Sequence, residues 1–183
     1  AQQIFGMPSQ FMVIGSDPIV TVFDFGISYA AVISLAVAGV GALFLARSRF
    51  GRYVLAIGGN RQASYLSGLP VQRTRMQVFV VSGLCVAIAA VLLTSRLFIG
   101  DPNAGEGYEL NAIAAVIIGG TSLFGGKGTV LGTLFGALII GVLQNGLDLL
   151  SVNDHLKQIV IGSIIIFAVL LDYYRRKFSD ARN

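Results

Sequence analysis

The sequence has very few of the residue types from which catalytic and metal sites are built. Its 183 residues include one cysteine, Cys85, and one histidine, His155. A single cysteine excludes an intrachain disulfide and a cysteine-based metal site, and we expect Cys85 to be a small core residue. His155 has neither the nucleophile nor the ligand set that a catalytic or metal-binding histidine requires. We therefore predict that the chain is not an enzyme and has no metal or cofactor of its own.

Charged residues are also scarce, at 12% of the chain against about 25% in an average soluble domain. They are absent from five stretches of 14 to 22 residues. A helix of about 20 apolar residues crosses the roughly 30 Å hydrocarbon core of a bilayer. Backbone amides must be paired there, and apolar residues that run continuously exclude barrel strands. The sequence predicts an all-α fold, one polytopic membrane domain over 1–183, with transmembrane helices over 25–46, 76–95, 110–126, 128–147 and 153–172.

The chain starts with Ala-Gln-Gln, without an initiator methionine and without a basic segment before an apolar stretch. This start is not a signal peptide, and we expect the chain to begin inside a larger protein. None of the predicted spans carries a charged residue in its middle. The ion and proton relays of secondary transporters therefore find no support in these residues.

The basic residues occupy alternate segments between the predicted spans. Segment 47–75 carries six arginines and no acid, whereas segment 96–109 carries three acids and one arginine. Lys127 lies between the third and fourth spans, and the tail 173–183 carries four more basic residues. Placing these basic segments inside puts 11 of the 13 Lys and Arg residues in the cytoplasm, and this bias sets topology. We expect the amino-terminal segment 1–24 outside and the carboxyl end inside, with no nucleic-acid partner.

Glycine is abundant, with 23 residues in the chain. Gly128, Gly132 and Gly136 recur on one face of the fourth predicted helix, a spacing that lets two helix backbones touch. We favour a packing seam within the chain over a subunit interface. The segment 125–129 differs from a phosphate loop, which needs Ser or Thr directly after its lysine. We predict a tight cytoplasmic turn there instead.

Segment 47–75 contains the clearest local signal. Asn60 suits a helix N-cap, Gly68 suits the position after a helix, and Pro70 prevents its continuation. These residues predict a helix of about two turns. Because so short a helix is marginal alone in water, it should form against a partner. The arginines favour lipid headgroups, whereas the small apolar face favours a groove on a cytoplasmic protein.

The same residues resemble a known family. The match is to the cytoplasmic coupling segment of the permeases of ATP-driven, binding-protein-dependent sugar importers of the ribose, xylose and arabinose type. It rests on Gly51-Arg52-Tyr53, Gly58-Gly59-Asn60-Arg61-Gln62-Ala63 and Leu66-Ser67-Gly68. The resemblance covers about residues 47–172 and continues through Gly107-Tyr108-Glu109-Leu110, Gly119-Gly120-Thr121-Ser122-Leu123, Gly125-Gly126-Lys127-Gly128 and Asn145-Gly146-Leu147.

The resemblance implies a permease subunit of the bacterial inner membrane that transports and does not catalyse. ATP would be bound by a separate cytoplasmic subunit, a sugar-binding protein outside would face residues 96–109, and a second permease copy would complete the pore. Family permeases are longer than this chain, which would be their carboxyl-terminal portion. The residues that the resemblance implies for docking to the ATP-binding subunit are Gly58, Gly59, Asn60, Arg61, Ala63, Tyr65, Leu66, Ser67 and Gly68.

Other polar residues suggest where a solute would pass. Those in or at the ends of the predicted spans are Asn111, Thr121, Ser122, Gln144 and Asn145. We favour hydrogen bonds between packed helices for each, over a sugar path. Two alternatives stay open for the whole chain: a permease of the same family for nucleosides or branched-chain amino acids, and a truncated membrane scaffold that does not transport.

Overall fold

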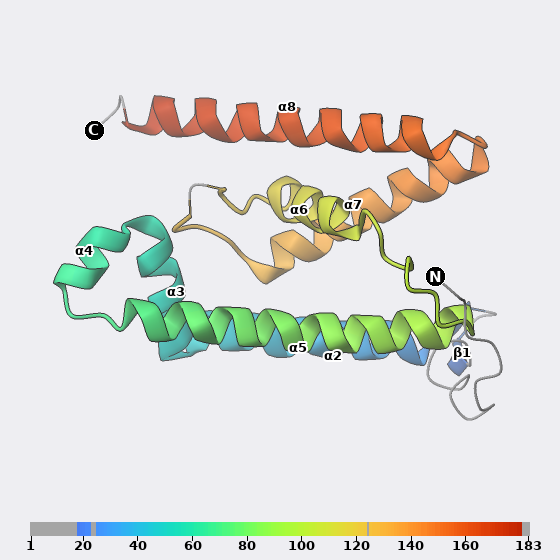
Figure 1. Cartoon of the computed structure of the whole chain (residues 1–183), viewed down its shortest axis with the longest axis horizontal. Coiled ribbons are helices and arrows are strands. Elements are labelled where there is room, and N and C mark those ends of the chain that lie inside the picture. The colour runs from blue at the N-terminus through green and yellow to red at the C-terminus, as the bar shows by residue number, and fades with distance from the viewer. Residues whose placement is uncertain (1–17, 23–24, 124, 181–183) are drawn as a thin grey trace. The chain divides into compact units, whose positions relative to one another are not determined.

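The computed structural model describes residues 18–22, 25–123 and 125–180, and helices dominate this part of the chain (Figure 1). The all-α prediction is confirmed, since the strands among the described residues are two short ones that pair with each other. The elements in chain order are β1 (Pro18–Val22), β2 (Phe25–Ser28), α2 (Tyr29–Arg47), α3 (Arg49–Gly59), α4 (Arg61–Leu66), α5 (Val71–Leu97), α6 (Tyr108–Ile118), α7 (Val130–Leu149) and α8 (Asp154–Asp180).

The two strands form an antiparallel hairpin directly before α2. Val22 pairs with Phe25, and Pro18 pairs with Ser28. The hydroxyl of Ser28 accepts a hydrogen bond of 3.3 Å from the amide of Ala31, which satisfies one of the unpaired donors of the first turn of α2. The predicted start of the first helix at residue 25 is therefore wrong by four residues. Much of the predicted external segment 1–24 lies outside the described residues.

Four described helices are long and apolar enough to cross a membrane, namely α2, α5, α7 and α8. The chain is thus a multi-pass membrane protein. The third predicted span, 110–126, is wrong in its extent, because α6 ends at Ile118. Its 11 residues measure about 16 Å, roughly half of a hydrocarbon core. Gly119 caps the helix, and Gly120 takes a left-handed conformation with φ of 82°, so the backbone turns away from a helical path.

The chain divides into two compact units. The first unit comprises residues 1–43 and 72–106, and the second comprises residues 44–71 and 107–183. In the first unit, α2 and α5 run in opposite directions (Figure 1). Nearly all of α5 belongs to it, and this helix extends beyond the predicted 76–95 at both ends. Cys85 is exposed on α5, so its predicted core position is wrong: its apolar surroundings would be lipid instead of protein.

The core of the second unit lies where α6 packs against α7 and α8. Ala114 and Ala115 of α6, Ile140 of α7 and Ile161 of α8 form a buried hydrophobic cluster. The predicted glycine seam is confirmed as a contact within the chain. A Cβ on Gly136 would overlap the carbonyl of Ala115, and the backbones of Gly132 and Gly119 meet in the same way. A stretch of α6 thus packs antiparallel to α7 with backbone touching backbone.

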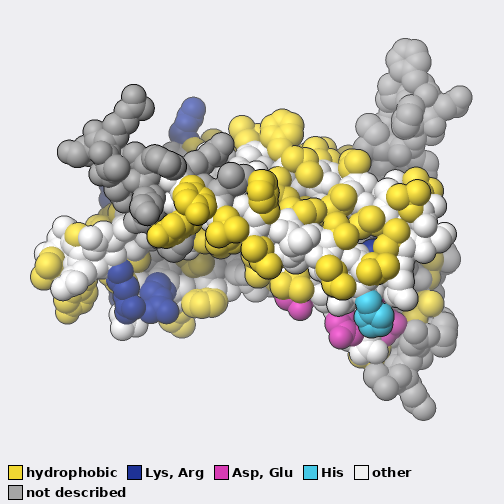
Figure 2. All heavy atoms as spheres, turned by 90° about the horizontal axis from the view of Figure 1, so that it is seen from above, with side chains coloured by type: hydrophobic (Ala, Val, Ile, Leu, Met, Phe, Trp, Pro, Cys, Tyr) yellow, Lys and Arg dark blue, Asp and Glu magenta, His cyan; other side chains and the backbone are white. Residues whose placement is uncertain are grey.

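The outer surface of α8 is strongly hydrophobic. Figure 2 shows apolar side chains gathered over this helix, with His155 and acidic side chains near its start. Ile159, Ile166 and Phe167 of α8 are all exposed. An apolar surface of this extent is normal where lipid covers it and unusual on a soluble monomer. The bilayer is therefore the natural environment of these helices.

Candidate functional site

A helix that the sequence analysis missed, α3, leads into the candidate site. The hydroxyl of Ser48 accepts a hydrogen bond of 3.0 Å from the amide of Gly51 and caps the start of α3. A side chain at Gly51 would collide with the backbone of Leu45. Because glycine has no side chain, α3 can begin right after α2. The missed signal was in the sequence: a capping serine followed by apolar residues at helical spacing, namely Phe50, Tyr53, Val54 and Ile57.

The predicted short helix is confirmed as α4, with both of its predicted boundaries. Oδ1 of Asn60 accepts a hydrogen bond of 2.9 Å from the amide of Ala63. At the other end, Gly68 has a φ of 78°, and its amide donates to the carbonyl of Tyr65 at 3.0 Å. The amide of Leu69 donates to the carbonyl of Ser64, also at 3.0 Å. These two bonds form a Schellman motif, so α4 is a closed unit of six residues with satisfied ends.

The two sides of α4 differ sharply in exposure. Ser64 is only 6% exposed, whereas Tyr65 is 72% and Leu66 is 78% exposed. The other predicted docking residues at and after the start of α4 are exposed as well: Asn60, Arg61, Ala63, Ser67 and Gly68. One side of α4 is therefore anchored to the protein, and the other presents two large apolar side chains beside an arginine. Such a face is too narrow to insert deeply into lipid, and it suits a shaped groove on a protein.

Gly58 and Gly59, the remaining predicted docking residues, lie against the chain itself. A Cβ on Gly58 would be 2.9 Å from the backbone nitrogen of Gly126, and one on Gly59 would be 3.7 Å from the Cα of Gly126. Side chains at these positions would point toward the turn between α6 and α7. The structure therefore places both glycines against another segment of the same chain.

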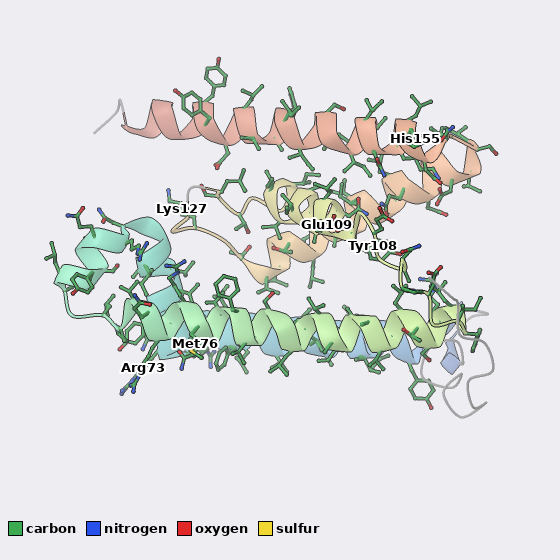
Figure 3. The ribbon with its side chains drawn as sticks, in the orientation of Figure 1. Arg73, Met76, Tyr108, Glu109, Lys127 and His155 are labelled. Atoms are coloured by element: carbon green, nitrogen blue, oxygen red, sulfur yellow. The ribbon has the colours of Figure 1, made fainter. Side chains whose placement is uncertain are left out.

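The turn between α6 and α7 confirms the predicted tight turn. The amide of Ser122 donates to the carbonyl of Lys127 at 3.0 Å, and the amide of Gly125 donates to the carbonyl of Ser122 at 3.1 Å. Gly125 and Gly126 have φ values of 85° and 79°, a backbone form that other residues rarely adopt. Figure 3 shows Lys127 in this turn, at the end of the second unit that carries α4, whereas His155 lies at the other end.

Comparison with known proteins places this architecture in a family. Residues 1–169 match the family described as branched-chain amino acid transport system / permease component. The chain belongs to this permease family. The permease is 51% identical over 130 residues to the ribose import permease protein RbsC of Bacillus subtilis, covering 71% of this chain and 40% of that protein. It is 48% identical over 147 residues to the xylose transport system permease protein XylH of Haemophilus influenzae, covering 80% of this chain and 39% of that protein.

The same relation holds for the ribose import permease protein RbsC of Escherichia coli K12. Identity is 48% over 139 residues, which cover 73% of this chain and 43% of that protein. The permease thus spans about two fifths of the length of the curated relatives it matches. No solved structure matches it. The description of this family names a transport system.

The permease does not bring the five predicted path residues together. Thr121 and Ser122 lie in the turn before α7, and the side chain of Thr121 covers Gly128. Gln144 and Asn145 lie near the far end of α7, about 20 Å from the start of that helix. Asn111, in the first turn of α6, belongs to the far end as well. For Ser122 the favoured prediction of a packing hydrogen bond is confirmed: its hydroxyl donates to Oδ2 of Asp172 at 2.9 Å.

A charged cluster closes the far end of the second unit. Nζ of Lys157 lies 2.5 Å from Oδ1 of Asp148 and 2.8 Å from Oδ1 of Asp154, which joins the end of α7 to the start of α8. These carboxylates are largely exposed, so the pairs add little stability. Within the described ranges, no group of three His, Cys, Asp or Glu side chains is placed to hold a metal ion.

Proposed function

We propose that this chain is a permease portion of an ATP-driven, binding-protein-dependent importer of monosaccharides of the ribose, xylose and arabinose type. The observation that carries the proposal is the identity of 51% and 48% to ribose and xylose permeases over most of this chain. The capped helix α4 adds a structural feature suited to coupling. Its exposed Tyr65 and Leu66 are free to enter a partner's groove.

In this proposal, α4 docks into a groove on a separate cytoplasmic ATP-binding subunit. Closing of two such subunits on ATP would move α4, and the movement would switch the spans between outward and inward access. A lever of this kind must keep its shape under load, and the closed caps at Asn60 and Gly68 support that. A second permease copy and an external sugar-binding protein would complete the system.

The orientation follows from the same proposal, with the amino-terminal segment outside and α4 inside the bacterial plasma membrane. The placement of 11 of the 13 basic residues on the α4 side favours it. So does the position of Lys127 at the end of the second unit that carries α4, whereas His155, the neighbour of Asp154 in the sequence, lies at the other end (Figure 3). Residues 96–109 would then face the binding protein.

Binding to the ATP-binding subunit tests the proposal. The full chain, solubilised in mild detergent, is captured together with the ATP-binding subunit of a ribose importer. We expect the wild-type chain to retain this subunit, and Leu66→Arg to release it, because an arginine replaces an apolar side chain in the groove. Ala56→Arg is the matched control, since Ala56 is exposed on α3 near the arginines of that helix and outside α4.

Three outcomes separate the possibilities. Loss of binding in Leu66→Arg with binding kept in Ala56→Arg supports docking by α4. Equal binding by all three chains contradicts it, and so does absence of binding by the wild-type chain. Membrane insertion of each variant is checked by its abundance in the membrane fraction.

The family description supports a second candidate solute, a branched-chain amino acid. Uptake of radiolabelled ribose, xylose and leucine, measured with the chain assembled with its ATP-binding subunit and binding protein, separates the two. We expect ATP-dependent uptake of a pentose. Uptake of leucine alone supports the second candidate, and ATP-dependent uptake of nucleosides would support the remaining family solute. Binding of the ATP-binding subunit without any uptake would support a membrane scaffold.

A further inference from the structure

In the described part of the chain, the end of α3 and the turn between α6 and α7 approach each other backbone to backbone. A Cβ on Gly58 would lie 2.9 Å from the backbone nitrogen of Gly126 and 3.6 Å from the Cα of Gly125. Seen from the other side, a Cβ on Gly125 would overlap the carbonyl of Gly58. The two segments therefore touch through backbone atoms, with no side chain between them.

Hydrogen bonds within the turn between α6 and α7, and from it to α8, make this turn stiff. Ser122 bonds to both Lys127 and Gly125 through the backbone, and its hydroxyl holds Asp172 of α8. Directly after this turn, the hydroxyl of Thr129 accepts a hydrogen bond of 3.1 Å from the amide of Gly132 and caps α7. A displacement of the turn would thus act on the start of α7 and on the inner part of α8.

On the other side of this contact, α4 is joined to α3 by a short connection. A single residue, Asn60, separates α3 from α4, and it caps both helices: its side chain bonds the start of α4 and its amide donates to the carbonyl of Ala56 in α3. The two helices also pack against each other. Force on α4 therefore reaches Gly58 and Gly59 without passing through a flexible linker.

We propose that Gly58, Gly125 and Gly126 are positioning residues that pass the movement of α4 to the turn between α6 and α7, and through it to α7 and α8. The inference rests on the proposed docking of α4 and adds the route by which the docked helix acts. Direct contact of backbones suits this task, because closely packed atoms pass on a displacement that flexible side chains would absorb.

Two adjacent glycines of α3 provide a matched pair for the test. Gly58→Ala places a methyl group 2.9 Å from the nitrogen of Gly126, which forces the segments apart, whereas Gly59→Ala meets the Cα of Gly126 at an ordinary 3.7 Å. Both changes add the same methyl group to the same helix end. The full chains are assembled with the ATP-binding subunit and the binding protein, and three quantities are measured: retention of the ATP-binding subunit, ATP hydrolysis and ATP-dependent ribose uptake.

We expect Gly58→Ala to keep the ATP-binding subunit and its ATP hydrolysis while ribose uptake per ATP hydrolysed falls by about tenfold. Gly59→Ala should keep both. Equal uptake per ATP by the two variants would overturn the inference and leave the proposed docking intact. Loss of the ATP-binding subunit in Gly58→Ala would also overturn it, because the glycine would then act on docking itself. Failure of the wild-type chain to bind this subunit would instead overturn the proposed function.

A second measurement needs no substitution. Amide hydrogen exchange of the wild-type assembly is followed before and after ATP is added, with peptides that cover α4 and residues 119–129. We expect the turn to change its exchange together with α4. A change in α4 without any change in the turn would contradict transmission through this contact.

Discussion

The hydroxyl of Ser122 donates a hydrogen bond of 2.9 Å to Oδ2 of Asp172, and so joins the turn before α7 to the last turns of the α8 span. Both side chains are half-buried. From the sequence, Ser122 is a candidate for the solute path and Asp172 is the end of a predicted span. Their contact gives both residues a structural role, because it joins α8 to the turn between α6 and α7.

Ser122→Ala tests that role. It removes the donor to Asp172, and we expect the free energy of unfolding to fall by about 1 kcal/mol. Ser163→Ala is the control, because the exposed Ser163 hydroxyl bonds to Val160 within α8; its effect should stay within about 0.5 kcal/mol. Thermal unfolding in detergent measures both. If Ser122→Ala left stability unchanged but weakened the apparent affinity for ribose, Ser122 would instead line the sugar path.

The glycine seam between α6 and α7 gives a second prediction. A methyl group at Gly136 would overlap the carbonyl of Ala115, so Gly136→Ala should destabilise the protein by about 1–3 kcal/mol. Gly141 lies further along α7 with open space around its Cβ position. Gly141→Ala should therefore be neutral, or stabilising by up to about 1 kcal/mol through its better helix propensity. Similar losses in both variants, measured by chemical unfolding in detergent, would contradict the seam.

The cap of α4 gives a third prediction. Asn60→Ala removes the side chain that accepts from the amide of Ala63, and we expect α4 to lose about 1 kcal/mol of local stability. Affinity for the ATP-binding subunit should then fall about fivefold to tenfold, because the partner must order a looser helix. Asn60→Ser keeps a capping oxygen and should bind nearly as the wild type does. Equal affinity of all three chains in a titration would mean that the cap does not matter for docking.

Orientation can be tested with thiol labelling of intact cells. In a chain with Cys85→Ser, single cysteines are placed at Ala104 and Gln62, which are both exposed. We expect an impermeant reagent added outside to label the cysteine at 104 and to spare the one at 62. Labelling at 62 without permeabilisation would place α4 outside. Labelling of both sites after permeabilisation provides the control.

The boundaries of α4 could be predicted because they depend on neighbours. Asn60 and Gly68 bond to amides and carbonyls within a few residues. Asparagine is common at helix N-caps and glycine is common just after a helix, so the residue types predict these roles. The segments that carry Lys and Arg between the spans are visible in the sequence itself, and the orientation inferred from them stays a prediction.

The extent of α6 could not be predicted from hydropathy. Residues 119–126 are as free of charge as residues 110–118 before them, but their path depends on the left-handed glycines and on hydrogen bonds that close the turn. The contact of Gly58 with Gly126 could not be predicted either. It joins segments far apart in the sequence and has no local sequence signal. The seam at Gly132 and Gly136 was visible as a spacing, whereas its partner helix was not.

Cross-linking from position 66 in living cells tests the central claim most directly. Leu66 is replaced by a photoreactive amino acid, with the same replacement at Ala56 as the control, and each cross-linked product is identified by mass spectrometry. We predict that position 66 cross-links to an ATP-hydrolysing subunit on the cytoplasmic side and that position 56 does so far less. Cross-links from position 66 to lipid alone, or to no nucleotide-hydrolysing protein, would contradict the docking of α4.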